Sequence, residues 1–197
     1  METILDLRPL HLRALGTAGT VLARVAPVDL ERATPCVGWN LLTLIAHMIG
    51  QNHGFASAVE LGDAPVSAYA GRPPEPGRIG AVWGESADRL AAAFAAADLD
   101  RPVRLVEISR DLMFSVATVV GFQLLDTVVH AWDVATALGE RFRPDDELVA
   151  TTLAQARSVP GGPARTRDGA AFAPAVPASG NDDWSELLAL LGRHASL

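Results

Sequence analysis

Two histidines and an aspartate are the side chains of this sequence best suited to bind a divalent metal. Asp126 and His130 are four residues apart within an apolar stretch, so on a helix their Cβ atoms would lie about 6 Å apart on one face. That separation lets both side chains reach one ion at about 2 Å, as they do on metal-binding helices. A carboxylate or an imidazole is costly to bury without a partner, and a cation would compensate both.

The alternative for this pair is an ordinary Asp–His hydrogen bond on a helix surface, because pairs with this spacing are common. His47 is a third candidate ligand, since it is a solitary histidine in the apolar run 44–49. A histidine in such a run is more often a hydrogen-bonded core residue than a ligand. The spacing by itself therefore leaves a metal site and a polar core contact about equally open.

The periodicity of apolar residues predicts four main helices that would position these side chains, over 7–25, 41–59, 79–97 and 115–138. Asn40 is a suitable N-cap for the second helix, and Gly139 is suited to end the fourth.

Shorter helices are expected over 145–157 and from Asp182 or Asp183 to Gly192, with an exposed connection at 62–77. The predicted fold class is all-α, a four-helix bundle with long connections and a short C-terminal helix, forming a single domain over 1–197. The second and fourth helices must be adjacent if His47 and His130 share an ion.

Composition excludes several classes of function. Hydrophobic residues make up 49% of the chain and charged residues 20%, as in ordinary globular proteins, and the net charge of −7 argues against nucleic acid as a partner. No apolar run approaches the ~18 residues of a membrane span, and the start of the chain lacks the layout of a signal peptide. One cysteine, Cys36, excludes an internal disulfide and fits a cytoplasmic location. All 16 basic residues are arginine, so no lysine Schiff base is available.

Two sequence blocks resemble a known family. The first is Thr-Pro-Cys-Val-Gly-Trp-Asn at 34–40 with Leu-Ile-Ala-His at 44–47, and the second is Val-His-Ala-Trp-Asp-Val-Ala at 129–135, through Gly139. Both resemble the mycothiol-dependent maleylpyruvate isomerase N-domain family, which belongs to the DinB-like group of metal-binding four-helix bundles. The closing Leu-Leu-Gly-Arg at 190–193 is similar to the end of an uncharacterised metal-binding subfamily. The resemblance implies a DinB-like bundle with a metal held by His47, Asp126 and His130, zinc first, with iron, nickel or manganese as alternatives.

The sequence departs from the isomerase in two respects. The isomerase has a glutamate where this chain has Asp126, which is one methylene shorter and would draw the ion closer to the fourth helix. The isomerase also carries an additional C-terminal domain. The ligand role survives the first change, while isomerase activity itself is left open.

A ligand set of two histidines and one carboxylate leaves coordination positions open, which is typical of catalytic sites. The resemblance implies a thiol-dependent S-transferase or isomerase that uses mycothiol and acts on a small electrophile. A metal-dependent hydrolase, a non-haem iron oxygenase with the same ligand set, and a metal-binding module without turnover are the alternatives. The expected partner is a small-molecule substrate, with no nucleic acid and no membrane, and a homodimer is compatible with the sequence. No catalytic residue beyond the ligands is predicted.

The sequence also gives predictions for several residues near the candidate ligands. Asp133 is expected either to orient a ligand histidine or to form a conventional salt bridge. Cys36 is expected to pack within its loop, and Gln51 is in a position to line the site. Asn52 and His53 are expected to face solvent.

Overall fold

The computed structural model describes residues 5–166 and 170–194 and divides into two compact units, one ending at Glu140 and one beginning at Arg141. The structure is mostly helical, with one small two-stranded sheet. Among the described residues, no helix has both the length and the apolarity that crossing a membrane requires.

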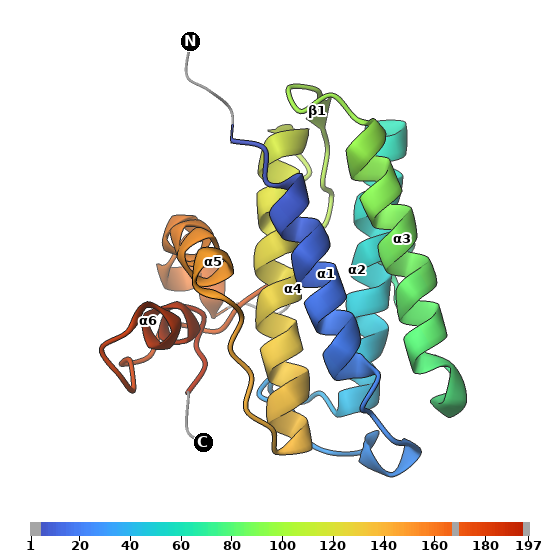
Figure 1. Cartoon of the computed structure of the whole chain (residues 1–197). Coiled ribbons are helices and arrows are strands. Elements are labelled where there is room, and N and C mark those ends of the chain that lie inside the picture. Colours follow the sequence, from blue (N-terminus) through green and yellow to red (C-terminus); the bar gives the residue numbers. More distant parts are fainter. Residues whose placement is uncertain (1–4, 167–169, 195–197) are drawn as a thin grey trace. The chain divides into compact units, whose positions relative to one another are not determined.

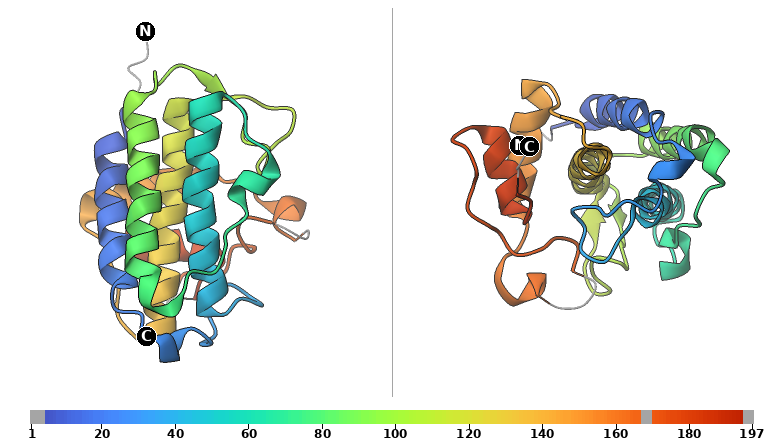
Figure 2. Two further views of the ribbon diagram at one scale, coloured as in Figure 1. Left: turned by 90° about the vertical axis from the view of Figure 1, so that its right-hand side faces the viewer. Right: turned by 90° about the horizontal axis from the view of Figure 1, so that it is seen from below.

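The first unit is a bundle of the four predicted main helices. They are α1 (Arg8–Leu22), α2 (Leu41–Leu61), α3 (Ile79–Ala96) and α4 (Val116–Leu138) (Figure 1). Helices α1 and α2 each contact both α3 and α4, so the four form a closed ring when the bundle is viewed along its axis (Figure 2). The predicted four-helix bundle and the predicted adjacency of α2 and α4 are therefore confirmed.

The ends of α2 and α4 are set by local chemistry that can be read in the sequence. The side chain of Asn40 accepts a hydrogen bond from the amide of Thr43, which caps α2 as predicted. Ser115 caps α4 in the same way, and Gly139 ends that helix in the left-handed conformation at a φ of 75°.

The connection after α2 is packed more closely than its Pro- and Gly-rich sequence predicts. It contains the 3-10 helices η2 (Val66–Tyr69) and η3 (Pro76–Arg78), and it runs back along α2, so that α2 and α3 point in the same direction (Figure 2). Tyr69 is only 4% exposed and lies against Gly54, where a Cβ would meet its ring. The expectation of an exposed connection is wrong at this point, because the glycines of α2 admit the connection.

A second connection, between α3 and α4, contains the small antiparallel sheet. Strand β1 (Pro102–Val103) pairs with β2 (Phe114–Ser115). A further 3-10 helix, η1 (Pro27–Asp29), lies between α1 and α2.

The second unit is built on two helices that pack against each other, α5 (Asp146–Ser158) and α6 (Asp183–Leu190). Asp182 caps α6, as predicted, by accepting hydrogen bonds from two backbone amides. Between the helices lies η4 (Gly162–Arg165), and the Arg165 guanidinium donates hydrogen bonds to backbone carbonyls of this unit.

Candidate metal centre

His47, Asp126 and His130 converge on the interface between α2 and α4. One ligand atom from each lies within 4.8 Å of the other two, and the two imidazole rings are 5.2 Å apart between centroids. His130 Nε2 lies 3.3 Å from Asp126 Oδ1, close to the roughly 3.3 Å that separates two ligands bound at about 2 Å to a tetrahedral ion. The three side chains that the sequence singled out are therefore brought together.

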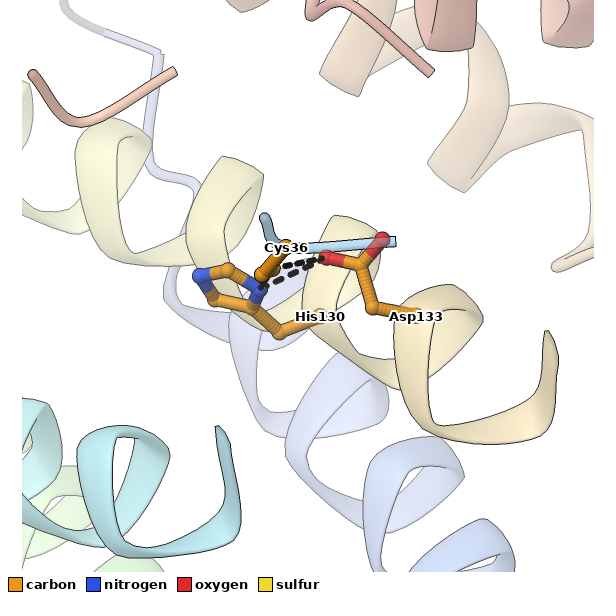
Figure 3. Close-up of side chains that lie close together, drawn as sticks. All are labelled: Cys36, His130 and Asp133. Carbon is orange, nitrogen blue, oxygen red and sulfur yellow. Dashed lines mark hydrogen bonds and ion pairs between the residues drawn. The ribbon is translucent and has the colours of Figure 1, made fainter. Parts of the chain in front are cut away.

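Asp133 contacts Nδ1 of His130, whereas Asp126 contacts Nε2 on the other side of the ring. The Oδ2 atom of Asp133 lies 2.8 Å from His130 Nδ1, and Asp133 is 0% exposed (Figure 3). A proton on Nδ1 would be donated to this carboxylate, which leaves Nε2 directed towards Asp126 and His47. Carboxylate–histidine–metal arrangements use this geometry to fix the tautomer of a ligand histidine.

His47 offers a neutral imidazole. It is half-buried, and the Trp39 ring lies 4.8 Å from its own. Burial lowers the pKa of His47 to about 4, although the charge of Asp126 opposes that effect. A histidine with this pKa is unprotonated at neutral pH, as a metal ligand must be.

His130 has the opposite protonation behaviour in the metal-free protein. Burial by itself would lower its pKa, but the carboxylates of Asp126 and Asp133 outweigh burial and raise the pKa well above 6.5. The two carboxylates thus favour a positive charge at the position of His130. The donor set and its spacing are compatible with a divalent-metal site of two histidines and one carboxylate.

Cys36 lies closer to this cluster than the sequence predicts. Its thiol donates to Asp133 Oδ2 at 3.3 Å, and its Sγ is 3.9 Å from His130 Nδ1 (Figure 3). Cys36, His130 and Asp133 thus form a second group of three with metal-ligand atoms within 4.8 Å. That group would use Nδ1 of His130, the atom already hydrogen-bonded to Asp133.

Of the polar residues that follow His47 on α2, Asn52 differs from expectation, and His53 is only partly exposed. Gln51, one turn after His47, is 5% exposed and donates a hydrogen bond to Glu107 Oε2 at 2.8 Å. Glu107 is not predicted from the sequence, because it lies in a connection that contains no motif. Asn52 does not face solvent. It is 0% exposed and hydrogen-bonds to Ser86 of α3 and Gln123 of α4, because α2 packs against both helices.

Comparison with known proteins places the chain in a family. The family described as the mycothiol maleylpyruvate isomerase N-terminal domain matches residues 12–135, which include all three candidate ligands. The chain belongs to this family. Two uncharacterised proteins of Mycobacterium tuberculosis, from strains CDC 1551 / Oshkosh and ATCC 25618 / H37Rv, are each 30% identical over 158 residues, which cover 77% of this chain and 78% of theirs.

Two solved structures share the fold. A crystal structure of mycothiol-dependent maleylpyruvate isomerase has a TM-score of 0.60 at 17% identity and covers 78% of this chain and 71% of its own. The crystal structure of a histidine-to-alanine mutant of that enzyme has a TM-score of 0.63 at 14% identity and covers 79% and 70%. These similarities support the predicted four-helix-bundle fold.

Proposed function

We propose that this protein is a divalent-metal-dependent enzyme that uses a low-molecular-weight thiol to act on a small electrophile, by S-transfer or isomerisation. The observation that supports the proposal most directly is the convergence of His47, Asp126 and His130 at one point between α2 and α4. Family membership supports mycothiol as the thiol, since the family is described by that cofactor. Zinc is the first candidate for the metal, and the cytoplasm is the proposed location.

Each residue would contribute a defined property. His47 supplies a neutral nitrogen because burial lowers its pKa to about 4. His130 supplies Nε2, oriented by Asp133, and Asp126 supplies the single negative charge among the three ligands. With three protein ligands, coordination positions are left for water, thiol or substrate.

The ion would bind the thiol as thiolate and lower its pKa, so that a nucleophile is available at neutral pH. One carboxylate and two neutral imidazoles leave a divalent ion with a net positive charge, which favours an anionic sulfur as the next ligand. The thiolate would then attack the electrophilic carbon of the substrate. If the C–S bond is retained, either a leaving group departs with its electron pair or the adjacent carbon takes up a proton, which gives transfer. If the C–S bond breaks after rearrangement, the thiolate is released and the result is isomerisation.

The test is an activity assay on zinc-loaded protein with maleylpyruvate and with a panel of small electrophiles, each with and without mycothiol. Turnover that requires both metal and thiol, and that is lost in His47→Gln, supports the proposal. His53→Gln is the matched control, because His53 lies on the same helix but outside the ligand cluster.

Other outcomes would contradict the proposal. Metal-dependent turnover without thiol would indicate a hydrolase, and oxygen consumption by the iron-loaded protein would indicate an oxygenase. A tightly held metal with no turnover on any substrate would indicate a binding module.

A further inference from the structure

Glu107 is a carboxylate held beside the candidate metal centre by a fixed turn. It lies in the connection between β1 and β2, two residues after Leu105, which is fully buried. The amides of Ile108 and Ser109 both donate to the carbonyl of Leu105, at 2.9 and 2.8 Å. The turn that carries Glu107 is therefore anchored to the bundle core, while Glu107 itself is exposed to solvent.

Gln51 connects this carboxylate to the helix that carries His47. Gln51 lies one turn after His47 on α2, so both side chains project from the same face of the helix. It is 5% exposed, and its Nε2 donates to Glu107 Oε2 at 2.8 Å. A buried amide that holds the end of an accessible carboxylate fixes the position of that carboxylate and leaves it within reach of a ligand.

Asp126 is the charged group that acts most on Glu107. Although Glu107 as a residue is exposed, partial burial of its carboxylate beside Gln51 is the main cause that raises its pKa; the hydrogen bond from Gln51 opposes this effect, and the charge of Asp126 on α4 raises the pKa further. On the connection after α2, Tyr69 has a pKa raised by burial and by the charges of Glu107 and Asp63. The Tyr69 hydroxyl is buried and has no hydrogen-bond partner in the part of the chain that the structure describes. The two carboxylates, Glu107 and Asp126, together favour a hydrogen-bond donor or a cation and disfavour an anion.

A metal ion at the three ligands would neutralise Asp126 but would leave Glu107 as a negative charge that is tied, through Gln51, to the face of α2 that carries His47. We propose that Glu107 is a specificity-determining residue: it selects, among molecules bound at the metal, those with a hydrogen-bond-donating or positively charged group near the reacting atom. This inference rests on the proposed metal centre. A charge-assisted hydrogen bond to a carboxylate is roughly twice as strong as a neutral one, and a nearby anionic group would be repelled.

The test measures the affinity of three small thiols for cobalt-loaded protein through the absorption band of the cobalt–thiolate bond. Cysteamine carries an ammonium group, 2-mercaptoethanol a hydroxyl, and 3-mercaptopropionate a carboxylate. We expect wild-type protein to bind cysteamine at least about tenfold more tightly than 3-mercaptopropionate, a difference of about 1.4 kcal/mol. In Glu107→Gln the ratio of the affinities for cysteamine and 3-mercaptopropionate should fall to within about threefold of 1. Glu107→Asp should retain most of the wild-type ratio.

Glu75→Gln is the matched control, because Glu75 is exposed, belongs to the same unit and loses the same charge. A ratio in Glu107→Gln equal to that of wild type, or an equal fall in Glu75→Gln, would overturn the inference while the metal centre stands. Wild-type protein that binds no cobalt would instead overturn the metal centre, and the inference with it. If the protein bound cobalt but the cobalt-loaded protein bound none of the three thiols, both the proposed thiol role and the proposed selection by Glu107 would be contradicted.

Discussion

His130 Nδ1 and Asp133 Oδ2 lie 2.8 Å apart in the bundle interior, on successive turns of one helix. This contact fixes which nitrogen of His130 faces Asp126 and His47. The carboxylate therefore contributes to the candidate site without being one of the three converging ligands. The contribution of Asp133 to metal affinity can be measured.

Replacing Asp133 with Asn should weaken zinc binding by about 10–100-fold while the stoichiometry stays at one ion per chain, because the substitution keeps the shape but removes the charge that orients His130. Calorimetric titration of metal-free protein with zinc gives both quantities. Cys36→Ser is the control, since a hydroxyl can donate to Asp133 as the thiol does, and it should change the affinity by less than about threefold. An unchanged affinity in Asp133→Asn would mean that the carboxylate does not orient a ligand.

The affinity for zinc should fall about tenfold for each pH unit between about 7 and 5, corresponding to one proton released per ion bound. Two histidines with the ordinary pKa of about 6.5 would approach a slope of two as pH falls. Here the pKa of His47 is lowered to about 4, so it is already neutral over this window. His130 has a raised pKa and supplies the one competing proton.

Competition with a chelator, corrected for the chelator's own protonation, measures this slope. A second proton should enter only near pH 4, where His47 becomes protonated. A slope near two between pH 7 and 5, or an affinity independent of pH, would contradict these protonation states.

His11 should make the protein less stable in acid, independently of the metal. It is 1% exposed against Phe94, and burial lowers its pKa to about 3. The unfolded chain takes up a proton near pH 6.5 but the folded chain does not, so stability falls as pH drops from about 6.5 to about 3, by up to about 1.4 kcal/mol per unit. His11→Leu removes this loss. Urea unfolding at pH 7 and pH 5 should show a loss about 1–2 kcal/mol smaller in the variant, and equal losses would contradict the prediction.

Gly71→Ala should destabilise the bundle near the metal centre. A Cβ at Gly71 would collide with the backbone carbonyl of Ala46, the residue before His47. Overpacking against backbone costs about 1–3 kcal/mol, and the displacement should also weaken metal binding. Gly77→Ala on the same connection meets no atom within 4 Å. Thermal unfolding of both variants tests the difference, and equal stability would show that the connection can move away from α2.

Local signals in the sequence predict the helices because each helix is determined by its own residues. Asn40 and Gly139 fix an end of α2 and of α4 through side-chain capping and left-handed backbone conformation. The pair Asp126–His130 could be found because its spacing has a meaning on any helix. His47 is a candidate because it is the only histidine of an apolar run, and the family resemblance is what implies that it is a ligand.

The contacts that loops make with the site could not be predicted. Cys36 contacts Asp133 and Glu107 contacts Gln51 from loops whose paths depend on packing across the whole unit. The sequence predicts Asn52 at the surface because its periodicity indicates a single buried face of the helix. Since α2 packs against both α3 and α4, a second face is buried and Asn52 lies within it.

X-ray absorption at the zinc edge of the loaded protein tests the central claim most directly, because it distinguishes the two groups of potential ligands around His130. A centre made of His47, Asp126 and His130 predicts a first shell of nitrogen and oxygen at about 2.0–2.1 Å, with multiple scattering from two imidazoles and no sulfur. A sulfur neighbour at about 2.3 Å in the thiol-free protein would instead indicate the group of Cys36, His130 and Asp133, and would contradict the account.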